Sequence, residues 1–154
     1  MNKILATTFA LAALSMLTPR LSVRAEEAKS AAQTSDKEQT ALQGTWEGVE
    51  KGEEGKGKST MTVTGNSMHF QGANKEEWYK ATFKILRDKD PQQLQATITE
   101  SPAKEFVGKT SIAIFKIEDN TLTLSGKKPG TSGTPNSFDD KEDTRVFVMK
   151  KKAE

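Results

Sequence analysis

The chain contains no cysteine and only one histidine, His69. Without cysteine there is no disulfide framework, and any metal site would have to be built from carboxylates. A catalytic triad would need partners for the histidine, and no nucleophile–base pair can be named in this sequence. His69 alternates with Met68 and Phe70, so the pattern predicts that its side chain faces solvent. We therefore expect no metal, no cofactor and no enzymatic activity.

The sequence has only one long apolar run, and this run lies close to its start. Lys3 precedes the uncharged segment 4–17, Pro19 ends it, and Ala25 completes a site that a signal peptidase can read. The run is shorter than the roughly 20 residues that span a bilayer. We predict a signal peptide over residues 1–25 and export to the periplasm or the extracellular space. No cysteine follows the run, which excludes a lipoprotein anchor, and no later segment predicts an integral membrane span.

Neither sign of charge dominates the chain that would remain after cleavage. The full sequence has 23 basic and 21 acidic side chains. Three basic residues, Lys3, Arg20 and Arg24, lie in the predicted signal peptide, so 20 basic side chains remain against the same 21 acidic ones. A nucleic-acid-binding protein needs a basic excess gathered on one face. We therefore expect no nucleic-acid partner.

Residues 26–39 contain no large apolar side chain and are rich in Ala, Glu, Lys, Ser and Gln. This composition is typical of a flexible, solvated linker. Ser35 and Glu38 have the spacing of a capping box, which predicts a short helix over Asp36–Leu42. Leu42 would then pack beneath the domain that follows. We assign residues 40–154 to that single domain.

Eight short segments with alternating or β-rich patterning make up most of this domain. They are Gln43–Glu50, Lys58–Thr64, Ser67–Gln71, Trp78–Leu86, Gln92–Glu100, Lys109–Glu118, Asn120–Ser125 and Asp143–Lys151. Tight connections at Gly65-Asn66, Arg87–Pro91 and Asp119-Asn120 have the chemistry of hairpin turns. The pattern therefore predicts consecutive antiparallel strands.

The connections alternate between short and long, and this rhythm predicts a closed barrel. The long ones are Lys51–Gly57, Gly72–Glu77, Ser101–Gly108 and Gly126–Glu142. In an antiparallel meander every second connection lies at the same end, so the long loops gather at one mouth. We therefore predict an all-β fold, an eight-stranded antiparallel up-and-down barrel with a short N-terminal helix.

The first strand opens with Gly44-Thr45-Trp46, in which the indole can plug the narrow end of a barrel. Together with Ile98–Pro102 and Ile117–Leu124, this motif resembles a bacterial lipocalin-like domain family of unknown function. The family is a calycin-type barrel common in exported proteins of planctomycete-type bacteria, and the resemblance covers residues 42–152. It implies that a basic residue late in the last strand, Lys150 or more specifically Lys151, packs over the indole. It implies a fold and names no ligand.

Two further motifs have ordinary explanations. Gly52–Ser59 matches the phosphate-loop pattern, but a strand follows where that motif needs a helix, and Glu53 and Glu54 would repel phosphate. We interpret it as a charged hairpin loop. The acidic cluster of Asp139, Asp140, Glu142 and Asp143 lacks the spacing and the glycine of an EF-hand. We interpret it as a solvated loop.

The inward positions of the predicted barrel decide between two functions. Residues proposed to contact a ligand are Tyr79, Phe83, Ile98 and Phe115 inside the barrel and Phe138 as a lid from the last long loop. Eight strands make an interior just wide enough for side chains to fill, so a packed core is the competing interpretation. In two strands both faces are apolar, at Ile112 and Ile114 and at Val146 and Val148; the extra face would be covered by the N-terminal helix or by a partner.

The first hypothesis is that the protein binds a small apolar molecule in the barrel interior. The alternative is a protein-interaction or inhibitor module of the cell envelope that acts through the loops at the open end. The interior volume separates the two, because a cavity of about 300 Å³ or more favours ligand binding. A closed interior favours the interaction module.

Overall fold

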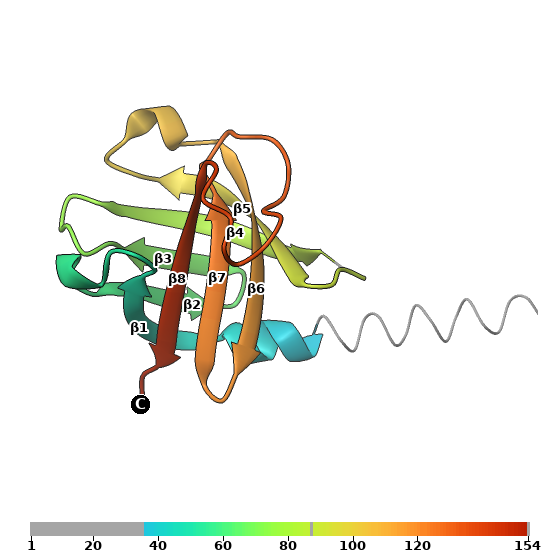
Figure 1. The fold of residues 1–154 in the computed structure, drawn as a ribbon. Coiled ribbons are helices and arrows are strands. Elements are labelled where there is room, and N and C mark those ends of the chain that lie inside the picture. The colour runs from blue at the N-terminus through green and yellow to red at the C-terminus, as the bar shows by residue number, and fades with distance from the viewer. Residues whose placement is uncertain (1–35, 87, 154) are drawn as a thin grey trace, which may run out of the picture.

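A computed structural model describes residues 36–86 and 88–153. The predicted signal peptide and most of the predicted linker lie outside these residues. Eight strands form the body of the molecule (Figure 1). They are β1 (Gly44–Glu50), β2 (Ser59–Thr64), β3 (Ser67–Gln71), β4 (Trp78–Leu86), β5 (Gln92–Glu100), β6 (Thr110–Glu118), β7 (Thr121–Lys127) and β8 (Thr144–Lys151). Two 3-10 turns, η1 (Glu54–Lys56) and η2 (Lys104–Phe106), lie in the loops.

The strands form a closed antiparallel barrel in which each strand pairs with its neighbours in sequence. The first and last strands close it, and their register places Trp46 opposite Lys151 and Glu50 opposite Phe147. The predicted up-and-down barrel is confirmed, and every strand begins and ends within two residues of its predicted bounds. Closure also removes the unpaired sheet edges on which an open sheet would aggregate.

The tight turns owe their geometry to residues that tolerate a positive φ. Asp119 and Asn120, between β6 and β7, have φ values of 47° and 58°. Gly65, between β2 and β3, has a φ of 57°. Two-residue turns of this kind match the right-handed twist of the paired strands. The short connections therefore lie together at one end of the barrel, called the closed end below.

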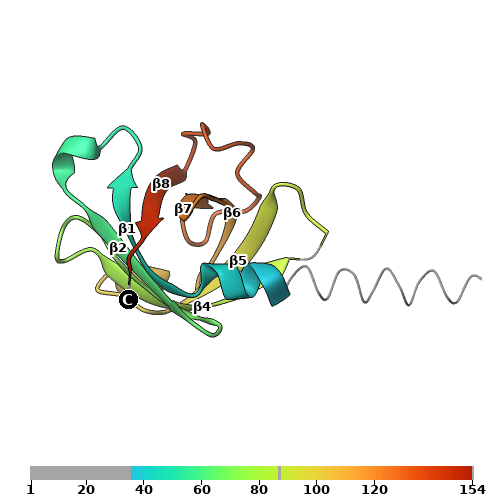
Figure 2. The same ribbon diagram turned by 90° about the horizontal axis from the view of Figure 1, so that it is seen from below.

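A helix over residues 36–42 lies at this closed end, beside the C-terminal end of β8 (Figures 1 and 2). It ends at residue 42 as predicted, and residue 36 is the first that the structure describes. Gln43, directly after the helix, accepts a hydrogen bond from the Gly65 backbone N–H at 2.7 Å and donates to the Gly65 carbonyl at 3.1 Å. The Trp46 indole N–H donates to the Leu42 carbonyl at 2.8 Å, and both side chains are buried. The helix therefore seals the end that the indole fills.

The loop between β7 and β8 packs along the outside of β6. Near its start the Gly130 N–H donates to the Thr110 carbonyl at 2.9 Å, and farther along the Lys116 ammonium lies 5.7 Å from the Phe138 ring centroid. Beneath it, the outward-facing Ile114 is almost fully buried, at 1% exposure. On β6 the extra apolar face is thus covered by this loop, whereas the sequence predicted the helix or a partner; on β8, Val146 is buried but Val148 stays 39% exposed.

Candidate functional site

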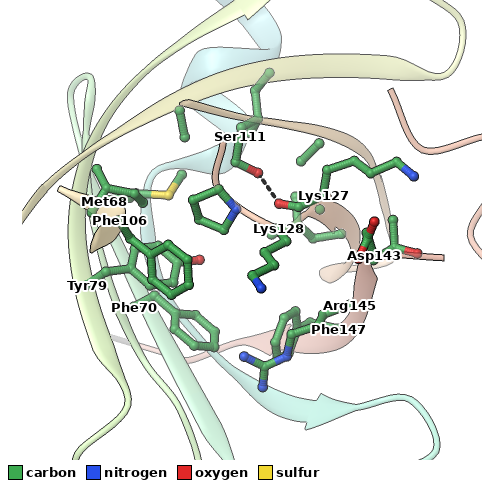
Figure 3. A pocket seen from close by; sticks show the side chains of 18 of the residues that line it. Met68, Phe70, Tyr79, Phe106, Ser111, Lys127, Lys128, Asp143, Arg145 and Phe147 are labelled. Atoms are coloured by element: carbon green, nitrogen blue, oxygen red, sulfur yellow. Dashed lines mark hydrogen bonds between the residues drawn. The ribbon is translucent and has the colours of Figure 1, made fainter. Parts of the chain in front are cut away.

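A cavity of about 400 Å³ lies inside the barrel and opens at the end opposite Trp46. Its walls are mostly apolar, and charged residues occur where the strands meet the long loops. The lining comprises Met68, Phe70, Tyr79, Leu94, Ala96, Ile98, Phe106, Ser111, Ala113, Leu124, Gly126, Lys127, Lys128, Pro129, Lys141, Asp143, Thr144, Arg145 and Phe147. Figure 3 shows most of these side chains arranged around one central space.

Small residues on the middle strands leave room for the cavity. Ala96 of β5 and Ala113 of β6 face the interior and are buried, and Gly126 of β7 pairs with Ala113. A methyl group placed on Gly126 would lie 3.7 Å from the Ala113 side chain, in ordinary van der Waals contact. Larger residues at these three positions would fill the interior. The cavity is therefore a direct consequence of the side-chain volumes in the sequence.

Two of the four residues predicted to line the interior do line this cavity. Tyr79 and Ile98 lie on its wall, whereas Phe83 and Phe115 belong to the core outside it. Both phenylalanines lie in the halves of their strands that run toward the closed end. They fill that narrower half of the interior, so only the half near the loops stays open.

Phe138 does not occupy the predicted lid position. It lies beside Lys116 on the outer side of β6 and is absent from the cavity lining. The loop that carries it runs down the outside of the barrel instead of across the mouth. The predicted lid position of this side chain is therefore corrected. The physical reason is that the outer surface offers Phe138 apolar neighbours, since it borders a hollow that is also lined by Ala41 and Pro91.

Three aromatic residues besides Tyr79 form part of the wall, and none of them was among the predicted ligand contacts. Phe70 stacks on Tyr79 with ring centroids 5.0 Å apart and meets Phe147 edge-on at the same distance. Phe106, from η2, adds a fourth ring to the lining. The signal for Phe106 was available, because it is the sole aromatic residue in the predicted rim loop Ser101–Gly108.

An ion-pair network holds one side of the mouth. The Arg145 guanidinium donates to both carboxylate oxygens of Glu50, at 2.8 and 2.5 Å, and also to Glu77. Hydrogen bonding to Glu50 is the first cause that raises the pKa of Arg145, so this residue is charged at any ordinary pH. Arg145 also lies over the Phe147 ring, 5.1 Å from its centroid. The network joins the last residue of β1, Glu50, to the start of β8.

Tyr79 gives a spectroscopic probe of the cavity, because it is the sole tyrosine of the chain. Burial raises the pKa of Tyr79 from 10.0 to about 12. We expect the tyrosinate absorbance of the native protein to appear well above pH 10, and the same absorbance in denaturant to appear near 10. Because the pKa is higher in the folded protein, the neutral hydroxyl contributes to the free energy of unfolding. This contribution is fully present below pH 10 and is lost as pH rises through 12. An ultraviolet pH titration of native protein with a midpoint at 10 would contradict this prediction.

The closed end has the arrangement that the resemblance implied. Trp46 is fully buried, and the Lys151 ammonium lies 5.3 Å from the indole centroid. A methyl group on Gly44 would approach the Lys151 side chain to 3.2 Å, so glycine there leaves room for the lysine stem. Lys151 also donates to the Ala41 carbonyl at 3.4 Å. The lysine therefore joins the helix, the first strand and the last.

The remaining motifs have structural partners. Lys58 of the phosphate-loop-like segment forms an ion pair with Glu47 at 2.8 Å, and strand β2 follows it directly. In the acidic cluster, Asp139 pairs with Lys51, and Asp140 accepts a hydrogen bond from the Asn136 N–H at 3.1 Å. Among the residues that the structure describes, no three histidine or acidic side chains converge as metal ligands would.

Comparisons with protein families, with curated proteins and with solved structures give no match. In the part of the chain that the structure covers, no helix has the length and apolar character needed to cross a membrane.

Proposed function

We propose that this protein binds a small apolar molecule in the barrel interior. The observation that carries the proposal is the cavity of about 400 Å³, whose wall is built from aromatic and aliphatic side chains and which opens at the loop end. Small-molecule sites in proteins have volumes of about 300–1,000 Å³ and mostly apolar walls with a few polar groups. The cavity volume is therefore larger than the threshold of about 300 Å³ that separates ligand binding from the interaction module.

Three further assignments accompany this proposal. The sequence of residues 1–25 supports export to the periplasm or the extracellular space, where the barrel would act as a carrier or a store. The Gly44–Trp46 motif beneath Lys151 supports a lipocalin-like relationship. The two aliphatic hydroxyls of the cavity lining both donate to backbone carbonyls and not to a base: Ser111 donates to Lys127 at 2.5 Å and Thr144 to Asp140 at 2.6 Å. This supports binding without catalysis.

The interaction or inhibitor module is the second candidate. Its support is that all four long loops surround one mouth, where Val107 is 42% exposed. Such a module would need no internal space, and the cavity is the reason for placing it second. The two candidates differ in whether the isolated protein takes up an apolar probe.

The cavity predicts uptake of N-phenyl-1-naphthylamine, a neutral fluorophore that brightens in apolar surroundings. Replacing Ala96 by Leu puts three extra carbon atoms into the cavity, since the Ala96 side chain is on its wall. We expect the affinity for the probe to fall about tenfold or more, because a filled site must expel either the probe or the new side chain. A fluorescence titration of wild type and variant measures this directly.

The matched control is Gln95→Leu, on the same strand. Successive side chains of a strand point to opposite faces, so Gln95 lies outside the barrel while Ala96 lies inside. We expect this control to bind the probe as the wild type does. If wild-type protein with a normal melting curve takes up no probe, the binding proposal is wrong and the interaction module takes its place.

A further inference from the structure

The cavity combines an apolar wall with an excess of positive charge at its opening. Its lining includes four basic residues and one acidic residue, Asp143. The basic residues are Lys127, Lys128, Lys141 and Arg145. All four belong to the end of β7, the start of β8 and the loop between them, so the positive charge is confined to one sector of the mouth. A ligand that fills the cavity would place its outer end against this sector of the mouth.

Two of these four basic side chains already have partners. Arg145 is bound to Glu50 and Glu77, and the Lys127 ammonium donates to the Glu142 carbonyl at 2.8 Å. These two side chains therefore serve the structure of the mouth. Lys141 is exposed, and it is only the last cause of the lowered pKa of Asp139, after the larger effect of Lys51.

Lys128 is different. Its ammonium forms no ion pair and no hydrogen bond with any residue in 36–86 or 88–153, and it lies 5.9 Å from the centroid of the Phe106 ring. Its backbone is fixed at both groups, since its N–H donates to the Asp143 carbonyl at 2.8 Å and its carbonyl accepts from the Thr131 N–H at 3.0 Å. Figure 3 shows the side chain projecting into the central space. An anchored backbone therefore presents an uncompensated charge to the cavity.

The Tyr79 hydroxyl is a second donor without a partner among the described residues. Its ring is held by stacking on Phe70 at 5.0 Å, and Figure 3 shows it among the side chains that surround the same space. It stays protonated at neutral pH, because burial raises its pKa to about 12. A neutral hydroxyl can donate one hydrogen bond, and an ammonium can donate three. The opening therefore offers more donors than acceptors, since Asp143 is the one acidic residue of the lining.

We propose that the ligand is an anionic amphiphile, an apolar chain ending in a carboxylate, with its head group bound by the Lys128 ammonium at the mouth. The proposal rests on the binding function proposed above and adds the chemical class of the ligand. The volume of about 400 Å³ is near the lower end of the range for small-molecule sites, so it fits one chain and not a two-chain lipid. A cationic head group would meet Lys128 with like charge.

Three ligands with the same chain and different head groups test this proposal. Decanoate, nonan-1-ol and nonylammonium share a nine-carbon alkyl chain; each displaces N-phenyl-1-naphthylamine from wild-type protein at pH 7, and their inhibition constants are compared. We expect decanoate to bind about fivefold tighter than the alcohol and nonylammonium to bind weakest. Added salt should weaken decanoate binding and leave the alcohol unchanged, because only the former uses a charge pair.

The variant Lys128→Gln should remove the preference for decanoate over the alcohol, measured as the ratio of the two inhibition constants within the variant, because that ratio cancels any change in affinity for the neutral probe. Lys104→Gln is the matched control, since Lys104 lies in the neighbouring rim loop and outside the cavity lining. Asp143→Asn keeps Lys128 and removes the one acidic group of the lining, so decanoate should bind slightly tighter.

The outcomes separate the two proposals. Equal affinities for decanoate and the alcohol, or a preference that survives Lys128→Gln, would overturn the anionic ligand and leave apolar binding intact. Failure of the neutral probe and of all three ligands to bind would overturn both.

Discussion

Replacing Trp46 by alanine is expected to lower the free energy of unfolding by about 3–5 kcal/mol. The indole is fully buried, and its N–H donates to the Leu42 carbonyl at 2.8 Å. The variant loses the contacts of the ring, leaves a cavity at the closed end and frees a buried carbonyl from its donor. It also takes away the surface over which the Lys151 ammonium lies. Urea unfolding followed by far-ultraviolet circular dichroism measures the loss.

The second tryptophan of the chain provides the control. Trp78 begins β4 and is partly exposed, with an edge-on contact to His69 at 6.1 Å. Trp78→Ala should cost about 1 kcal/mol or less, as expected for a substitution away from the core. If the two variants lose similar stability, Trp46 does not plug the barrel. Because each variant retains one tryptophan, emission spectra also show which ring is shielded from solvent.

The fold could be predicted from the sequence because its determinants are local. Alternation set the two faces of each strand, and Asp119-Asn120 and Gly65-Asn66 fixed tight turns through their tolerance of positive φ. Closure then followed from the order of short and long connections. The helix over residues 36–42 was likewise predicted from a local signal, the capping-box spacing of Ser35 and Glu38, although Ser35 itself lies outside the described residues.

The cavity could be predicted only in part, because its position depends on volumes summed across several strands. Tyr79 and Ile98 were found from alternation, but alternation gives the face and not the depth along the barrel axis. Whether Phe83 and Phe115 line a ligand site or close it depends on which end of the barrel is narrower. The role of Ala113 required the knowledge that it pairs with Gly126, and pairing register is a tertiary property.

The loops were the least predictable part. Phe138 was expected at the mouth because it is the sole large apolar residue of its loop, and the loop was assumed to close over a ligand. In the structure the same residue lies on the outside of β6, beside Lys116 and near Ala41 of the helix. A single apolar side chain in a loop predicts that the side chain will pack against the protein, but it does not predict which surface it will pack against. The charge of Lys128 at the opening was likewise hidden, since it depends on where the loop departs from β7.

One residue that the sequence analysis passed over has a large structural role. Gly48 lies in the middle of β1 and pairs with Met149 of β8, where the barrel closes. A glycine within a strand is a signal of close backbone approach. A methyl group built on Gly48 would lie 2.0 Å from the Val148 carbonyl oxygen and 2.5 Å from the Met149 Cα. The two strands that close the barrel therefore meet at a point where only glycine fits.

Gly48→Ala is expected to lower the free energy of unfolding by about 3 kcal/mol or more, because the obstacle is backbone and cannot turn aside as a side chain would. The clash must also exceed the stabilisation of about 0.4–1 kcal/mol that a glycine-to-alanine change gives through the unfolded state. Gly55→Ala is the matched control, since a methyl group there meets nothing within 4 Å, and its effect should stay within about 0.5 kcal/mol. Urea unfolding of both variants compares them. Similar stability in the two would mean that β1 and β8 separate at this point without cost, and that closure of the barrel depends instead on Trp46 and the helix that covers it.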